Sequence, residues 1–195
     1  MRSVSLHIQK DFYTLFAQIF SKGVDLPMED NRSIRDFLCL DIGIPDAYLD
    51  HRIQTVFMNG RPVDDVRAAM IGDGAVLALS AAMPGLVGAT LRRGGHLAAM
   101  RKEITYENST SSPPADAIRI RIKLFNLIAH ELGPVFLNHG VQVSASDMVD
   151  VLTMFAKRFR QDCRSMELDG GEVSMENLVA TLKTIDQIHL RVVEN

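Results

Sequence analysis

The sequence predicts an α+β protein in two parts, separated by a polar segment. Apolar residues alternate with polar ones over 3–8, the period of a half-buried strand. Over 12–20 they recur every three to four residues, the period of a helix that faces a core. Residues 101–116 are polar and rich in Ser and Pro, which is typical of a linker or an exposed loop. We therefore expect a mixed domain over 1–100 and a helical domain over 117–195.

The mixed N-terminal domain is expected to follow the order strand, helix, strand, helix, strand, strand, strand. The approximate positions are 4–8, 12–20, 24–28, 34–40, 53–58, 61–63 and 75–80. Gly23 is a plausible end for the first helix. Ser33 and Asp36 have the spacing of a capping box and predict the start of the second helix. Asn59-Gly60 predicts a hairpin, because both central positions of a type I′ turn need positive φ.

Two short motifs in this domain are similar to motifs of the β-grasp (ubiquitin-like) proteins. The matching residues are Phe57, Asn59, Gly60 and Val63 on the hairpin, then Asp73, Gly74, Val76 and Leu77 leading into the last strand. With the order of strands and helices, they resemble the small subunit of molybdopterin synthase and the sulfur carrier of thiamine biosynthesis. The resemblance covers residues 2–95 and implies a β-grasp fold for the N-terminal domain.

The segment that follows the last strand resembles the tail of a ubiquitin-type modifier, since it ends in Leu91-Arg92-Arg93-Gly94-Gly95. In that family the carboxylate of the terminal glycine is adenylated and then carries sulfur or a conjugated lysine. The resemblance implies this role for Gly95, or for Gly88 in a shorter alignment, and an adenylating enzyme as partner. In this chain His96 follows, so Gly95 has no free carboxylate unless the chain is cleaved after it.

The same segment suggests a second kind of site, one for a phosphate or carboxylate. Backbone N–H groups of glycines beside arginines can bind an anion. The candidate residues for either site are Gly85, Gly88, Arg92, Arg93, Gly94 and Gly95. The segment matches neither of the common nucleotide-binding glycine motifs. A tight loop that joins a sheet to a helix would also account for these glycines without a ligand.

The C-terminal domain is expected to consist of helices. Apolar residues between 118 and 136 recur at helical spacing, and Gly140 is a natural residue to follow the helix. Residues 118–124 also alternate strictly, so a strand remains an open alternative there. Two further helices are expected at about 146–156 and 174–188.

Composition and spacing argue against several classes of site. The net charge of −3 and the pI near 6.1 give no electrostatic case for nucleic acid or an anionic membrane surface. Cys39 and Cys163 are too few for a disulfide scaffold or a Cys-based zinc site. The histidines lack the spacing of metal ligands, and no catalytic triad can be nominated. We therefore expect no enzyme activity, metal or cofactor.

The sequence predicts a cytoplasmic protein, because its N-terminus lacks the apolar run of a signal peptide and the longest uncharged stretch, 75–91, is too short to span a membrane. The favoured function is a non-enzymatic β-grasp interaction or scaffold module that binds a protein partner or a second copy of itself. The first alternative is a sulfur-carrier or modifier precursor cleaved after Gly95. The second is a small-molecule or anion-binding domain that uses the segment 85–95.

Overall fold

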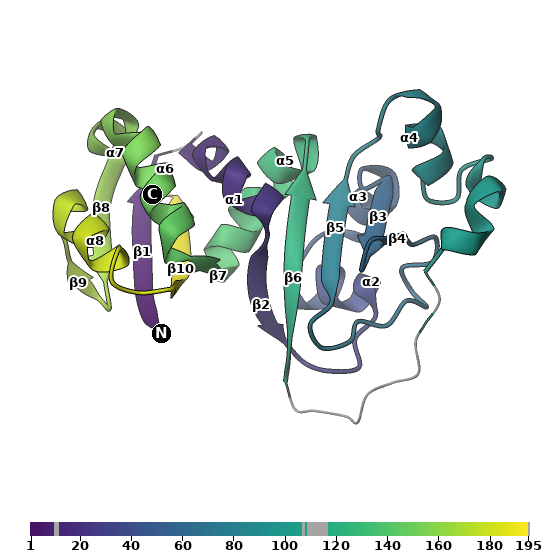
Figure 1. Cartoon of the computed structure of the whole chain (residues 1–195), viewed down its shortest axis with the longest axis horizontal. Helices are drawn as coiled ribbons and strands as arrows, with labels where there is room; N and C mark the ends of the chain where they lie inside the picture. Colours follow the sequence, from purple (N-terminus) through teal and green to yellow (C-terminus); the bar gives the residue numbers. More distant parts are fainter. Residues whose placement is uncertain (10–11, 107, 109–116, 195) are drawn as a thin grey trace. The chain divides into compact units, whose positions relative to one another are not determined.

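The computed structural model describes residues 1–9, 12–106, 108 and 117–194 (Figure 1). Within these ranges it contains ten strands and eight α-helices, which confirms the α+β class. The chain divides into two compact units. Unit 1 combines Met1–Val24 with His130–Asn195, and unit 2 is Asp25–Ala129. Because unit 1 contains both ends of the chain, unit 2 is an insertion in it.

The pairing of the first and last strands explains why unit 1 is discontinuous in sequence. Strand β1 (Arg2–Ile8) runs parallel to β10 (Gln187–Glu194), with paired residues along its whole length. The other neighbour of β1 is β8 (Cys163–Leu168), which is antiparallel to it. The sequence analysis instead placed residues 4–8 in one domain with 75–80. Local periodicity predicts that a strand exists but carries no information about its neighbours.

The sheet strands of unit 1 lie in the order β7-β10-β1-β8-β9. The two shorter strands are β7 (Val141–Ser144) and β9 (Gly171–Glu172). The helices that accompany them are α1 (Ala17–Lys22), α5 (Leu127–His139, from His130 onward), α6 (Ala145–Met154), α7 (Ala156–Asp162) and α8 (Met175–Leu182). A short 3-10 helix, η1 (Phe12–Phe16), precedes α1. The core contains Phe16 and Phe159, whose rings meet edge to face at 6.2 Å between centroids.

The prediction that residues 117–195 form a purely helical domain is wrong. The described part of 117–195 contains five strands in addition to its helices. Residues 118–125 form the strand β6, in which Ile118, Ile120, Ile122 and Leu124 are buried and the residues between them are more exposed. For residues 118–124, the strict alternation of apolar and polar residues was the correct indicator of structure, and the helical spacing was not. The last predicted helix ends at Leu182, and the chain then enters β10, whose buried residues also alternate.

The strands of unit 2 lie in the order β4-β3-β5-β6-β2. Their bounds are β2 (Val24–Met28), β3 (Thr55–Met58), β4 (Arg61–Pro62), β5 (Val76–Ser80) and β6 (Ile118–Phe125). Strand β3 is antiparallel to both β4 and β5, whereas β5 and β6 are parallel. Asn59 and Gly60 have φ of 52° and 78°, as the predicted hairpin turn requires. The Ser33 hydroxyl accepts a hydrogen bond from the Asp36 amide at 3.1 Å, as predicted for a helix start.

Two connections between strands of unit 2 are helical, the one from β2 to β3 and the one from β5 to β6. Between β2 and β3 the chain forms α2 (Ile34–Asp36), the π-helix η2 (Phe37–Asp41) and α3 (Asp46–His51). Between β5 and β6 it forms α4 (Gly85–Leu91) and the 3-10 segment η3 (Ala98–Ile104). Ile34, Phe37 and Leu49 bury their side chains in the core of the unit.

The parallel pairing of β5 with β6 determines the role of the chain between them. Two parallel neighbours cannot be joined by a hairpin, so the chain must return to the starting end of the sheet. Residues 81–117 are this return, and we call them the crossover segment. The predicted linker 101–116 falls within it, although residues 107 and 109–116 lie outside the described ranges. The predicted divisions 1–100, 101–116 and 117–195 are continuous stretches of the chain, whereas unit 1 consists of two stretches that flank unit 2 in the sequence.

Candidate functional site

Two of the candidate glycines belong to α4, at the beginning of the crossover segment. Gly85 is its first residue and has φ of 80°. Gly88 is buried, and a Cβ atom at this position would lie 2.0 Å from the carbonyl oxygen of Met83. No side chain fits at that distance, so packing of α4 against the preceding loop explains Gly88 without any ligand.

Arg93 attaches the crossover segment to the end of α3. Its backbone N–H donates to the Gln54 carbonyl oxygen and its Nη2 to the Leu49 carbonyl oxygen, both at 2.8 Å. The Asp50 carboxylate lies 3.5 Å from Nη2, and only 11% of the side chain is exposed. Burial lowers the pKa of Arg93, while Asp50 acts in the opposite direction. Arg93 therefore binds backbone carbonyls of its own unit instead of projecting into solvent.

A second arginine, Arg101, binds the same segment from the other side. Its side chain is only 3% exposed. It forms a bidentate ion pair with Asp64, in which the Nη2–Oδ1 distance is 2.6 Å and the Nη1–Oδ2 distance is 3.0 Å. Its Nε donates to the Thr90 carbonyl oxygen at 2.6 Å. Asp64 also accepts a hydrogen bond from the Gly94 amide at 3.2 Å. Sequence reasoning missed Arg101 because nothing local distinguishes it from a solvated linker residue.

Four of the six candidates, Arg92, Arg93, Gly94 and Gly95, are consecutive residues, and several of their donors bind groups of the same unit. Arg93 and Gly94 bind as described, and the Gly95 amide donates to the Arg92 carbonyl oxygen at 3.2 Å. The Arg92 side chain remains exposed, and Gly85 and Gly88 lie on α4. The arrangement is an ordered turn with a carboxylate of the protein in the position where an external anion would bind.

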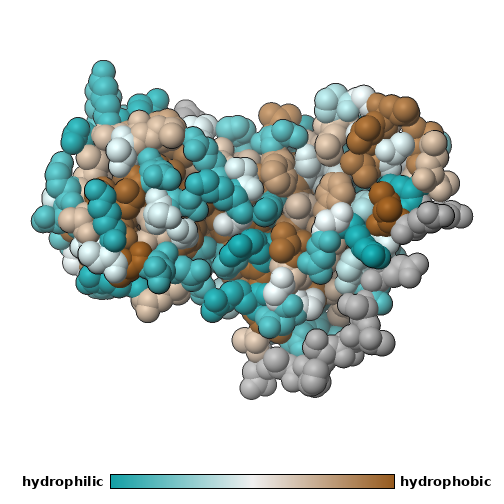
Figure 2. Space-filling model, viewed as in Figure 1, coloured by the Kyte–Doolittle hydropathy of each residue, from teal (hydrophilic) through white to brown (hydrophobic). Residues whose placement is uncertain are grey.

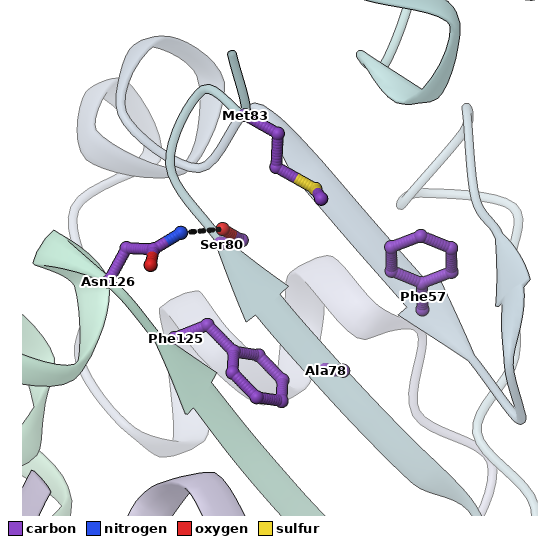
Figure 3. Close-up of a pocket in the computed structure, with 6 residues that line it drawn as sticks. All are labelled: Phe57, Ala78, Ser80, Met83, Phe125 and Asn126. Atoms are coloured by element: carbon purple, nitrogen blue, oxygen red, sulfur yellow. Dashed lines mark hydrogen bonds between the residues drawn. The ribbon is translucent and has the colours of Figure 1, made fainter. Parts of the chain in front are cut away.

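A different feature of unit 2 has the form of a binding site, and the sequence analysis did not anticipate it. A pocket of about 250 Å³ is lined by Phe57, Ala78, Ser80, Met83, Phe125 and Asn126 (Figure 3). The rings of Phe57 and Phe125 stand on either side of Ala78, and Met83 extends toward them from the loop after β5 (Figure 3). Its lining is almost entirely apolar.

The register of three strands produces this pocket. Phe57 on β3 is paired with Ala78 on β5, and Phe125 on β6 is paired with the next residue on that face of β5, Ser80. Ala78 has only a methyl group, so a hollow remains over the middle strand between two larger rings. The Asn126 amide donates to the Ser80 hydroxyl at 3.2 Å and closes one end of the hollow.

The pocket lies on one particular face of the unit 2 sheet, which we call the open face. In β5 the side chains of Leu77 and Leu79 are fully buried, whereas Val76 and Ala78, which alternate with them, are partly exposed. Strand β6 alternates in the same way. The residues that share the open face by this alternation and by register are Phe57, Val76, Ala78, Ser80, Arg119, Arg121, Lys123 and Phe125.

Further apolar side chains are exposed in the segments that follow the pocket strands. Leu86 and Val87 on α4 are 72% and 67% exposed, and Leu127 after β6 is 52% exposed. The apolar cluster over α4 is visible on the molecular surface (Figure 2). Exposed apolar side chains beside a pocket are typical of surfaces that bind other molecules.

Both cysteine thiols have a pKa above the usual value. Burial raises the pKa of Cys163 to about 11, so its thiol is protonated near neutral pH. Burial and the nearby Asp46 also raise the pKa of Cys39. Over the described ranges, no three residues of the types His, Cys, Asp and Glu are grouped so that they could hold a metal ion. The helices in those ranges are too short or too polar to cross a membrane.

Comparisons with protein-family models, with curated proteins and with solved structures found no match to this chain.

Proposed function

We propose that unit 2 is a non-enzymatic protein-interaction module, and that the pocket on its open face receives an apolar side chain of a partner protein. The pocket between Phe57 and Phe125 carries this proposal. Aromatic and Met side chains around a surface pocket are typical of the residues that dominate binding energy at protein interfaces. The pocket volume of about 250 Å³ lies below the range of about 300–1,000 Å³ typical of small-molecule sites. A single anchoring side chain suits that size better than a whole ligand.

The fold proposed for this module is a permuted β-grasp. The helical segment between β2 and β3, the hairpin of β3 and β4, and β5 occur in the order expected from the resemblance. Strand β6, which follows β5 in the chain, would take the place that the sequence analysis assigned to residues 4–8. Its parallel pairing with β5 supports this assignment.

The open face is a better candidate for the interface than the sheet edge at β4. Strand β4 has only two residues, and one of them is Pro62. Proline has no N–H to donate to an added strand, and short edge strands discourage such pairing. A partner is therefore expected to bind by side-chain insertion.

The two alternatives receive less support from the crossover segment. A carrier precursor would need Gly95 in an accessible chain, whereas Gly94 and Gly95 lie in a turn tied to Asp64 and Arg92. An anion bound at the same place would compete with Asp64, which already accepts a hydrogen bond from the Gly94 amide. The absence of enzyme activity and of a cofactor remains a prediction, as does the cytoplasmic location.

Site-specific photo-crosslinking in the native host tests the proposed function. A photoreactive phenylalanine analogue at position 125 is expected to form a discrete crosslinked product. The same analogue at Leu40, an exposed apolar residue of η2, is the matched control. Ala78→Leu should abolish the product by filling the pocket. Equal crosslinking at both positions, or a product that survives Ala78→Leu, would contradict the proposal.

A further inference from the structure

We infer that the partner of this pocket is an acidic peptide segment, in which an apolar anchor is flanked by Asp or Glu residues. The inference rests on the proposed function and specifies the chemistry of its partner. The observation behind it is a row of cations on β6 that begins at the rim of the pocket.

The row consists of Lys123, Arg121 and Arg119. These residues alternate with buried Ile and Leu residues along β6, so they share the open face with Phe125. The register places Lys123 opposite Ala78, in the floor of the pocket, and Arg121 opposite Val76. Side chains on one face of a strand repeat about every 6.6 Å, so the cations extend from the pocket along the strand.

Only the middle cation of the row has an ion-pair partner within the described residues. Both carboxylate oxygens of Asp25 accept from Arg121, at 2.7 and 2.8 Å, and this hydrogen bonding raises the pKa of Arg121. Arg119 and Lys123 form no ion pair with any residue of the described ranges. Asp73 is close to Arg119, but its carboxylate accepts from the backbone N–H. Among the residues that the structure describes, the row therefore contains two cations without an ion-pair partner, Lys123 beside the pocket and Arg119 farther along the strand.

These charges indicate which segment would bind. An extended peptide along β6 directs every second side chain toward the sheet. With an apolar residue in the pocket, carboxylates about two to six positions away would reach Lys123 and Arg119. Nucleic-acid binding draws much of its affinity from many contacts between Lys or Arg and phosphates, and two cations supply few of them. An acidic peptide matches both the apolar and the charged part of the surface.

Peptide selection on the intact chain tests the inference. A phage library of random dodecapeptides is panned on the wild-type protein after depletion on the Ala78→Leu variant. We expect the selected peptides to carry a large apolar residue flanked by Asp or Glu. One selected peptide, labelled with fluorescein, is then measured by anisotropy at 50 and 300 mM NaCl. Lys123→Glu and Arg119→Glu should each weaken its binding about three- to tenfold, with the larger effect at low salt.

A matched control separates this effect from a general change in charge. Arg164→Glu alters an exposed arginine of β8, in unit 1, and should leave the affinity unchanged. Pocket-dependent peptides that lack acidic residues and bind Lys123→Glu normally would overturn the inference but leave the proposed function intact. Failure to select any peptide that Ala78→Leu excludes would overturn the proposed function itself. Binding of a labelled oligo(dT) through Lys123 would assign the row to polyanions and also overturn the inference.

Discussion

The buried side chain of Arg101 forms a bidentate ion pair with the partly exposed carboxylate of Asp64, although 37 positions separate the two residues in the sequence. Asp64 follows β4 and Arg101 lies in η3, so the pair joins the crossover segment to the hairpin of unit 2. The same two side chains also bind the Thr90 carbonyl oxygen, just before the Arg-Arg-Gly-Gly sequence, and the Gly94 amide within it. This contact makes the segment an ordered part of the unit.

Replacement of Arg101 by Met is expected to lower the free energy of unfolding by about 1–3 kcal/mol, the usual cost of leaving a buried hydrogen-bonding group without its partner. It removes both the ion-pair partner of Asp64 and the donor to the Thr90 carbonyl oxygen. Urea denaturation measures the change, and limited proteolysis should locate new cleavage within residues 84–106. Arg92→Met, at an exposed site in the same segment, is the control and should change stability by less than about 0.5 kcal/mol. An Arg101 variant that is as stable and as protease-resistant as the wild type would contradict the proposed role of Arg101 in holding the crossover segment.

Gly88→Ala is expected to destabilise the protein by about 1–3 kcal/mol, the usual cost of overpacking. The new methyl group would lie 2.0 Å from the Met83 carbonyl oxygen, which is a backbone atom that cannot move alone. Because Met83 forms a wall of the pocket, binding of a pocket-dependent peptide should weaken as well. Gly72→Ala is the matched control, since its Cβ would meet no atom within 4 Å. Thermal melts of the two variants that coincide would refute this role for Gly88.

Cys163 is expected to react slowly with iodoacetamide and to make the protein less stable in alkali. Burial raises the pKa of its thiol from 9.0 to about 11 in the folded state. Between these pH values the unfolded chain has lost a proton that the folded chain keeps, so stability falls as the pH rises through this window. Urea midpoints at pH 8 and 10 measure the effect. Cys163→Ala should show a smaller decrease, and an equal decrease in both proteins would exclude Cys163 as the cause.

Removal of residues 1–8 is expected to unfold unit 1 while unit 2 remains folded. Strand β1 lies between β10 and β8, so its loss leaves two strands unpaired on one side. Hydrogen exchange followed by mass spectrometry should show lost protection in β10 and retained protection in β5. Retained protection in β10 would show that β1 is dispensable for unit 1. Replacement of Glu194, an exposed residue at the end of β10, by Ala is a control that should preserve protection throughout.

Periodicity and turn chemistry predicted the secondary structure where only local interactions matter. The alternation of Val4, Leu6 and Ile8 predicted β1, and Asn59-Gly60 predicted a turn with positive φ at both residues. The prediction failed where two periods coincided, as in 118–124, and where an apolar run changed from helix to strand after Leu182. The pocket was not anticipated, because its walls come from three strands and one loop and each residue is ordinary in its local sequence.

The sequence by itself determined that the chain alternates strands and helices, which residues face a core, and that glycines and arginines are concentrated at 85–95. Only the tertiary structure decided that β1 pairs with β10 and that β5 pairs in parallel with β6. The second pairing converts an apparent tail into a crossover segment and places Phe57 and Phe125 around Ala78. The physical reason is that periodicity reports which side of a strand is buried, whereas the neighbour of a strand depends on contacts between distant residues.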